Sequence, residues 1–339
     1  MQDWKQVQSA IAEAGNVLLL PHIHADGDCL GSAFGLAYFL CGKGISVEII
    51  SEEKPPENLS FVYRSGKMPA NMLFSVWDPQ NAEKISKYDL AIAVDTSDEK
   101  RLGSRKDLFY QAEMQIRIDH HISEDSFAPV TVCNTSWAAT AEGIWELIQT
   151  YEDFAQSPYR KEIAECIYTG ILTDTGCFAY SNVTSGTHRI AAELMDVAGN
   201  MAWQYSEIYE NQKKSEIALK AIAYRAVEYY GNGTIAFLCI TREEMNSVEA
   251  TDDDLESFAS FLRCIENVSV GIFVKPGNKA GVFRISLRSD VKCDVAAVAS
   301  QFGGGGHKRA AGFVYNETED VPFAAFKRHL IGEILKWME

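Results

Sequence analysis

Short apolar runs alternate with helix-like stretches through the first half of the chain. The runs typical of buried strands are residues 17–20, 47–50, 90–94, 116–118 and 130–133. The helix-like stretches lie near residues 4–14, 30–41, 138–150 and 159–171. Parallel strands that helices cover on both faces form continuous apolar runs, so this alternation predicts a parallel α/β sheet.

The pattern of the second half is different. Residues 184–227 are mainly helical in pattern, with little glycine or proline. Beyond residue 228, Gly231-Asn232-Gly233 separates two β-rich runs, and the turn-forming residues 275–279 separate the runs 268–274 and 282–287. These turn signals predict antiparallel pairs.

Two capping signatures in this half, Thr241 with Glu244 and Thr251 with Asp254, predict helix starts. We therefore expect two domains joined by helices. Residues 1–185 form a parallel-sheet α/β domain, residues 186–227 a helical linker, and residues 228–339 a smaller α+β domain with a mixed sheet.

The composition is that of an ordinary globular protein. Hydrophobic residues make up 47% and charged residues 23% of the 339 positions, which excludes a disordered or fibrous chain. The 31 basic and 47 acidic residues give a formal charge of −16. Such a chain repels a long phosphate backbone, so we expect no coating of long DNA, although a metal ion or a local basic patch can still hold a small nucleotide.

Membrane and disulfide signals are missing from the sequence. No segment approaches the roughly 18 uninterrupted apolar residues of a membrane helix, and the N-terminus resembles no signal peptide. The eight cysteines are scattered without a Cys-x-x-Cys pair, which favours reduced thiols over disulfides or zinc ligands. We expect a cytoplasmic protein with no membrane partner.

Aspartates and histidines follow several of the predicted elements. The first strand runs into His22, Asp26 and Asp28, the strand 90–94 runs into Asp95, and the strand 116–118 runs into Asp119-His120-His121. Asp174 follows the apolar end of a helix. In a parallel α/β sheet the binding groups collect at the carboxyl ends of the strands, so these side chains are expected at one edge.

Four carboxylates in one cleft repel each other unless cations neutralise them. Two divalent ions balance Asp26, Asp28, Asp95 and Asp174 by charge, and oxygen-rich sites with an imidazole favour Mn²⁺ over structural zinc. Each fragment alone has an ordinary explanation, such as a helix cap or a solvated turn. The conjunction at one sheet edge favours a two-metal site, which can hydrolyse phosphoesters.

A glycine-rich segment with basic neighbours is the second informative feature. Gly303-Gly304-Gly305-Gly306-His307 can expose backbone N–H groups to a phosphate, and it lacks the spacing of an ATP-binding P-loop. Residues 263–310 carry eight basic and three acidic residues, a net charge of +5 in an acidic chain. Arg288 lies within them and can grip a phosphate with two hydrogen bonds. The alternative is a flexible loop beside a solvated basic face.

These motifs together resemble the DHH phosphoesterase family, whose name is the triplet Asp119-His120-His121. His22-x-x-x-Asp26-x-Asp28, Asp95, and Asp174 in Thr173-Asp174-Thr175-Gly176 resemble further motifs of that family. The segment 303–307 resembles the signature of the DHH-associated C-terminal domain. The two-domain layout is similar to the bacterial nanoRNase/pAp phosphatase branch, although Ala25 stands where a proline often precedes the first aspartate.

The resemblance implies roles for these residues. His22, Asp26 and Asp95 would hold one Mn²⁺ ion, and Asp95 would be shared with a second ion. The second ion would be held by Asp28, Asp95, His120 and Asp174. Asp119 would orient His120, and His121 would bind the scissile phosphate or protonate the leaving oxygen. The substrate would be bound by Arg288, Gly304, Gly305, Gly306 and His307, which would reach the active site from the second domain.

The resulting expectation is a Mn²⁺-dependent phosphoesterase that trims very short RNA to mononucleotides and converts 3′-phosphoadenosine 5′-phosphate (pAp) to AMP by two-metal hydrolysis. Three alternatives stay open: hydrolysis of pyrophosphate or polyphosphate, hydrolysis of linear or cyclic dinucleotides, and a nucleotide-binding sensor without catalysis. A homodimer is compatible with the sequence.

Overall fold

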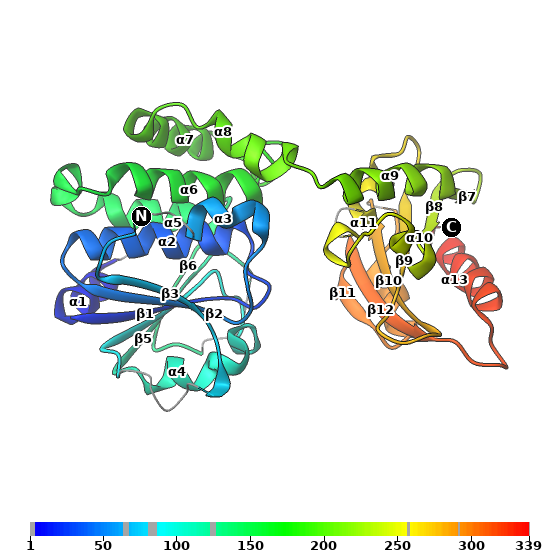
Figure 1. Ribbon diagram of the computed structural model, residues 1–339, viewed down its shortest axis with the longest axis horizontal. Coiled ribbons are helices and arrows are strands. Elements are labelled where there is room, and N and C mark those ends of the chain that lie inside the picture. Colours follow the sequence, from blue (N-terminus) through cyan, green and yellow to red (C-terminus); the bar gives the residue numbers. More distant parts are fainter. Residues whose placement is uncertain are drawn as a thin grey trace. The chain divides into compact units, whose positions relative to one another are not determined.

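The computed structural model describes residues 4–63, 68–80, 87–122, 127–255, 258–290 and 292–338. The chain divides into two compact units, which we call unit 1 (Met1–Asn211) and unit 2 (Gln212–Glu339). Each unit is built around one six-stranded sheet (Figure 1). The sequence-based prediction of an α/β parallel-sheet domain followed by a domain with a mixed sheet is confirmed.

Unit 1 alternates strands and helices along the chain. Its strands are β1 (Asn16–Pro21), β2 (Ser46–Ser51), β3 (Met72–Val76), β4 (Leu90–Val94), β5 (Met114–Asp119) and β6 (Val130–Cys133). Its α-helices are α1 (Lys5–Glu13), α2 (Gly27–Gly42), α3 (Ser60–Tyr63), α4 (Lys106–Gln111), α5 (Thr140–Gln149), α6 (Arg160–Asp174), α7 (Ser185–Ala198) and α8 (Ala202–Tyr205). Short 3₁₀ helices are Glu57–Leu59, Glu99–Arg105 and Glu152–Gln156, and a π-helical turn is Ser206–Glu210.

The sheet of unit 1 is parallel throughout, with strand order β3-β2-β1-β4-β5-β6. The apolar pattern predicts five of these strands and misses β3, which lies at the edge of the sheet and leaves Leu73 56% exposed. The order of the strands reverses direction between β1 and β4. Open α/β sheets bind their ligands at this topological switch point, beyond the carboxyl ends of the strands.

Both faces of this sheet are buried, which explains its continuous apolar runs. Along β1, Val17 and Leu19 join the core beneath α2, α5 and α6, whereas Leu18 and Leu20 join the core on the face covered by α4. Figure 1 shows α2, α5 and α6 on one side of the sheet and α4 on the other. Alternate side chains of a strand point to opposite faces, so one run supplies two cores.

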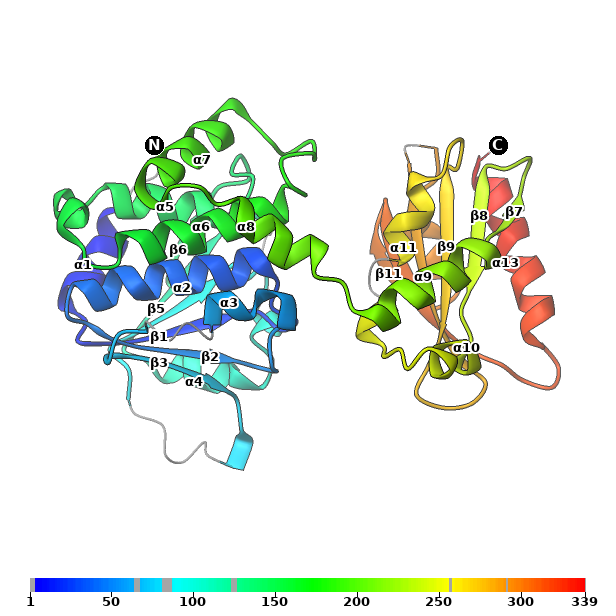
Figure 2. The same cartoon turned by 45° about the horizontal axis from the view of Figure 1, so that its top comes forward.

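Unit 2 has a mixed sheet of strand order β11-β12-β10-β9-β8-β7, in which only the β8–β9 pair is parallel among the described strands. Its strands are β7 (Glu228–Tyr230), β8 (Ile235–Cys239), β9 (Val270–Pro276), β10 (Val282–Ser289), β11 (Gly305–His307) and β12 (Ala310–Asn316). Its α-helices are α9 (Lys214–Ala226), α10 (Arg242–Ser247), α11 (Phe258–Phe261), α12 (Val295–Gln301) and α13 (Phe323–Met338), with 3₁₀ turns at Asp253–Leu255 and Leu262–Cys264. Figure 2 shows α9 and α13 on opposite sides of this sheet.

The two capping signatures have different outcomes. Thr241 and Glu244 form a complete capping box at the start of α10, as predicted. Thr251 donates its backbone N–H to Asp254 at 2.8 Å, but the element there is a three-residue 3₁₀ turn rather than an α-helix.

The helical stretch predicted as a linker, residues 186–227, is shared between the two units. Ala191 and Leu194 of α7 are buried in unit 1, where Leu194 belongs to the main core. Leu219 and Ala223 of α9 are buried against β8 in unit 2. No described helix in either unit combines the length and the apolar character needed to cross a bilayer.

Candidate metal centre

The sheet of unit 1 delivers the predicted residues to its switch point. His22 directly follows β1, Asp95 directly follows β4, and Asp119 is the last residue of β5. Asp95 has a φ of 56°, in the left-handed region that aspartate tolerates better than most residues. Such backbone conformations collect at functional sites, because the surrounding structure must hold them.

A close contact between α2 and α6 brings two further carboxylates to this point. Asp28 lies in the first turn of α2, and Asp174 is the last residue of α6. The helices run antiparallel: a Cβ on Gly31 would lie 2.4 Å from the carbonyl oxygen of Cys166, and one on Gly170 would lie 2.8 Å from Asp28 Oδ1. Glycines at positions 27, 31 and 35 leave the side of α2 that faces α6 without side chains.

We predict that Gly31→Ala destabilises unit 1 by about 1–3 kcal/mol, because the added methyl group forces α2 away from a backbone carbonyl. The free energy of unfolding from denaturant titration measures this. The matched control is Gly332→Ala in α13, where a Cβ meets no atom within 4 Å. That substitution is expected to leave stability unchanged or raise it by up to about 1 kcal/mol. Equal effects of the two substitutions would contradict the proposed role of the contact.

A buried arginine fixes the end of β1. The Arg105 guanidinium is fully buried and donates hydrogen bonds to the carbonyl oxygens of Pro21 (2.8 Å) and Ile50 (2.6 Å). Its Nε also donates to Glu52 at 3.0 Å. Arg105 therefore ties the carboxyl ends of β1 and β2 together, immediately before His22.

The structure brings the six predicted metal ligands together around two imidazoles. The Nε2 atom of His22 lies 3.7 Å from Asp26 Oδ2 and 3.4 Å from Asp95 Oδ2. The Nε2 atom of His120 lies 3.9 Å from Asp28 Oδ2, 3.7 Å from Asp95 Oδ1 and 3.6 Å from Asp174 Oδ2. Asp95 thus faces both imidazoles, one with each oxygen.

The hydrogen bonds of the two imidazole rings determine which nitrogen of each ring is unprotonated. The Nδ1 atom of His22 lies 2.6 Å from the carbonyl oxygen of Ile23, and that of His120 lies 3.3 Å from the carbonyl oxygen of Trp137. A carbonyl only accepts, so Nδ1 carries the proton and Nε2 is a lone-pair donor in the neutral ring. Both Nε2 atoms are buried and make no hydrogen bond among the described residues.

These residues fit divalent metal ions. Two donor atoms bound at 2.0–2.2 Å to the same ion lie about 3–4 Å apart, which is the spacing seen between each Nε2 and its carboxylate oxygens. A lone pair and several carboxylates that face each other in a buried cluster repel unless a cation lies between them. A ring nitrogen bonded to a backbone carbonyl is also the usual arrangement for a metal-binding histidine.

The carboxylates show the electrostatic cost of the cluster. Burial raises the pKa of Asp28 well above its usual range, and the negative charges of Asp95 and Asp174 raise it further. Burial also raises the pKa of Asp174 to about 6. Asp26 is both a helix cap and a cluster member: Oδ1 accepts the backbone N–H of Cys29, and Oδ2 faces His22.

Asp119 orients His121 rather than the ring of His120, which corrects the role expected from the resemblance. Its Oδ1 lies 2.8 Å from His121 Nδ1, and its Oδ2 accepts a hydrogen bond from buried Arg117. Although burial favours the neutral acid, hydrogen bonds from His121 and Arg117 lower the pKa of Asp119 to about 2. Asp119 Oδ1 also accepts the backbone N–H groups of His120 and His121, whereas the ring of His120 faces the carbonyl oxygen of Trp137.

In unit 2 the predicted substrate-binding residues share one region of the sheet. Arg288 on β10 and His307 on β11 both lie opposite Ala310 of β12, so their side chains leave the same face about two strand spacings apart. Packing requires glycine at positions 304 and 306, since a Cβ on either Gly304 or Gly306 would lie within 2.5 Å of a backbone oxygen of β12. A Cβ on Gly305 meets no atom within 4 Å.

Two residues of the cluster have no prediction from the sequence. Arg117 lies two positions before Asp119 on β5, so the strand period could have placed both on one face. Thr140, at the start of α5, donates its hydroxyl to Asp95 at 2.8 Å and its N–H to Asp28 at 2.6 Å. No pattern in the sequence marks it.

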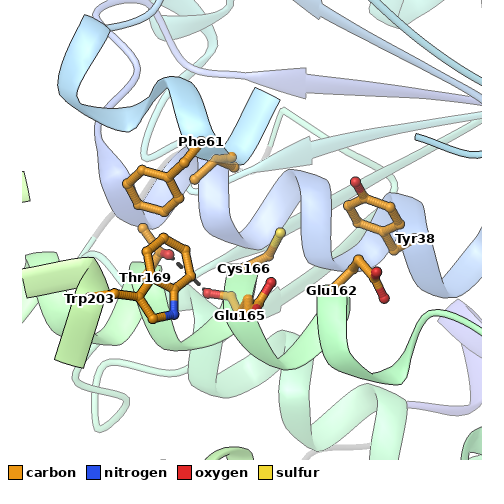
Figure 3. A pocket seen from close by; sticks show the side chains of 8 residues that line it. Tyr38, Phe61, Glu162, Glu165, Cys166, Thr169 and Trp203 are labelled. Carbon is orange, nitrogen blue, oxygen red and sulfur yellow. Dashed lines mark hydrogen bonds between the residues drawn. The ribbon is translucent and has the colours of Figure 1, made fainter. Parts of the chain in front are cut away.

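Unit 1 also has a small pocket away from the cluster, with a volume of about 30 Å³ (Figure 3). It is lined by Tyr38, Phe61, Val62, Glu162, Glu165, Cys166, Thr169 and Trp203. None of the predicted metal ligands is among these residues, and the pocket holds little more than a water molecule.

Comparison with known proteins covers both units. Residues 16–171 match the N-terminal domain of the DHH family, and residues 232–328 match the DHHA1 domain. A bifunctional oligoribonuclease and PAP phosphatase of Thermus thermophilus is 29% identical over 89% of this chain and 84% of its own. An enzyme of the same description from Bacillus subtilis is 25% identical over 87% of this chain and 88% of its own.

A solved structure is similar over nearly the whole chain. It is an exopolyphosphatase-related protein from Bacteroides fragilis, with 25% identity, a TM-score of 0.85, and coverage of 99% of this chain and 97% of its own.

Proposed function

Since the chain belongs to the DHH family, and is a phosphoesterase of that family, we propose that it uses divalent metal ions, Mn²⁺ in particular, to hydrolyse very short RNA and pAp. The products are mononucleotides from RNA and AMP from pAp. The observation that carries the proposal is the pair of buried Nε2 atoms of His22 and His120, which make no hydrogen bond among the described residues, face carboxylates and share Asp95.

The cluster offers two overlapping sets of ligands. One set is His22, Asp26 and Asp95, and the other is Asp28, Asp95, His120 and Asp174. Divalent ions in such a pair of sites supply positive charge to phosphate oxygens and lower the pKa of a bound water. The protein contributes by holding the carboxylates fixed, so that little reorganisation accompanies the reaction.

His121 acts on the scissile phosphate or the leaving group of the substrate. Asp119 holds its Nδ1, and the hydrogen bond between them raises the pKa of His121 despite its partial burial. A protonated imidazole held in this way can bind a phosphate oxygen or donate a proton to the leaving oxygen. The Asp119 carboxylate is kept in place by hydrogen bonds from the Arg117 side chain and from the backbone N–H groups of His120 and His121.

Unit 2 binds the remaining phosphate or the nucleotide. Arg288 and His307 leave one face of its sheet, and the glycine-rich segment at Gly304, Gly305 and Gly306 lies beside them. Arg288 is half-buried, and a partly desolvated guanidinium binds a phosphate more strongly than a fully solvated one. A second anion-binding site would favour substrates with two phosphates, such as pAp, or short phosphodiesters.

The nucleotide substrates are supported by the two bacterial relatives, which are described as oligoribonucleases and PAP phosphatases and resemble this chain over most of its length. A second candidate function is hydrolysis of polyphosphate or pyrophosphate. It is favoured by the likeness to the exopolyphosphatase-related protein, which extends over nearly the whole chain.

One product analysis tests these functions side by side. The purified chain, with and without Mn²⁺, is offered pAp, a trinucleotide RNA, a linear dinucleotide and pyrophosphate, and the products are separated by chromatography. We expect AMP from pAp and mononucleotides from RNA only in the presence of metal. Turnover of pyrophosphate alone would mean that pyrophosphate, and not a nucleotide, is the substrate. Binding of nucleotide without any turnover would indicate a sensor.

A further inference from the structure

We propose that Thr140 is a positioning residue, which orients Asp95 so that its two oxygens face different imidazoles. Asp95 Oδ2 lies 3.4 Å from His22 Nε2, whereas Asp95 Oδ1 lies 3.7 Å from His120 Nε2 and accepts the Thr140 hydroxyl at 2.8 Å. The inference rests on the proposed metal site.

Thr140 fixes two carboxylates from different parts of the fold. Its backbone N–H donates to Asp28 Oδ2 at 2.6 Å, and the next N–H, that of Ala141, donates to Asp28 Oδ1 at 2.9 Å. Asp28 therefore caps the first turn of α5 from a different helix, since the residue at the cap position, Ala139, has no polar side chain. One residue thus links Asp28 of α2 with Asp95 after β4.

The burial of Thr140 strengthens the hydrogen bond from its hydroxyl to Asp95. The residue is fully buried, so water does not compete for Asp95 Oδ1. A hydrogen bond to a charged acceptor in such surroundings is stronger than one at the surface. The backbone at Asp95 is in the left-handed region, and such a conformation persists only where surrounding contacts hold it.

The segment that carries Thr140 also orients His120. Just before α5, the carbonyl oxygen of Trp137 faces His120 Nδ1, and the N–H of Ala138 donates to the buried Glu142 side chain at 3.1 Å. The loop and the first turn of α5 therefore contact three of the proposed ligands, Asp28, Asp95 and His120. This is the arrangement expected of outer partners that tune a metal site.

The experiment titrates the metal-free full chain with Mn²⁺ in a calorimeter. Outer partners of metal ligands typically contribute about 10–100-fold in affinity, so we expect Thr140→Val to weaken Mn²⁺ binding by about that factor. Thr140→Ser keeps the hydroxyl and is expected to bind within about threefold of the unmodified chain. If Thr140→Val does not fold, the smaller Thr140→Ala takes its place.

Thr169→Val is the matched control. Thr169 is also fully buried in unit 1, at the pocket of Figure 3, and its hydroxyl lies within hydrogen-bond distance of Gln204 Oε1 (3.0 Å) and of the Glu165 carbonyl oxygen in its own helix (2.9 Å). This variant is expected to lose stability while keeping the Mn²⁺ affinity. Unchanged affinity in folded Thr140→Val, or equal losses in both valine variants, would overturn the inference about Thr140 alone. Absence of Mn²⁺ binding by the unmodified chain would overturn the metal site and the inference with it.

Discussion

Replacement of Asp95 by asparagine is expected to lower the turnover of pAp at least about 1,000-fold. Asparagine keeps the shape of the side chain and an acceptor for the Thr140 hydroxyl, but it removes the negative charge that faces both His22 and His120. Loss of an outer partner alone typically costs about 10–100-fold, and loss of a shared ligand affects both sites at once. The measurement is kcat for release of AMP at saturating Mn²⁺.

The same strand offers a control. Asp89 precedes β4 as Asp95 follows it, and Asp89 accepts the backbone N–H groups of Gly15 (2.8 Å) and Asn16 (2.9 Å) at the opposite end of the sheet. Asp89→Asn removes the same charge, and we expect turnover within about twofold of the unmodified chain. Substantial Mn²⁺-dependent turnover by Asp95→Asn would mean that the active site lies elsewhere.

Removal of divalent metal is expected to abolish turnover and to lower the melting temperature by roughly 5–11 °C. An ion present at 100 times its dissociation constant stabilises the folded state by about 2.7 kcal/mol, and each kcal/mol shifts the midpoint of a unit of this size by about 2–4 °C. Burial, together with the neighbouring carboxylates, raises the pKa values of Asp28 and Asp174, so a bound divalent ion is expected to stabilise their ionised forms. Scanning calorimetry of chelator-treated protein, with Mn²⁺ restored in steps, measures the shift.

The Asp95→Asn variant separates this effect from general binding of cations. An acidic chain with a formal charge of −16 attracts divalent ions at its surface, and that contribution is the same in the variant. We expect the variant to lose most of the Mn²⁺-dependent increase in melting temperature. An equal increase in both proteins would place the stabilising ions outside the cluster.

The residues of the cluster were predictable because the rules of parallel sheets are simple. Buried strands are recognisable in the sequence as apolar runs, and Asp95 and Asp119 lie where two such runs end. Their position at one edge of the sheet therefore follows from the parallel topology. Thr140 could not be predicted, because its contacts depend on how α5 packs against α2. The contact of Asp119 with His121 instead of the His120 ring depends on the local turn, which the order of residues does not specify.

The division of the helical stretch is a similar case. An amphipathic pattern shows that Leu194 and Leu219 are buried, but it does not show which core each of them joins. The structure assigns Leu194 to unit 1 and Leu219 to unit 2. The edge strand β3 escapes the pattern because its residues are partly exposed and give no sustained apolar run.

The cluster also has a consequence for how the chain acquires its activity. His22 and Asp174 lie 152 positions apart in the chain, and the antiparallel glycine contact between α2 and α6 is what brings the two ends of the ligand set together. Contacts between such distant residues form late, because the loop between them must first be closed. A nascent chain therefore lacks the full set of ligands until α6 has been synthesised and has docked against α2, so tight metal binding reports the docking of α6 and can precede the folding of α7 and α8.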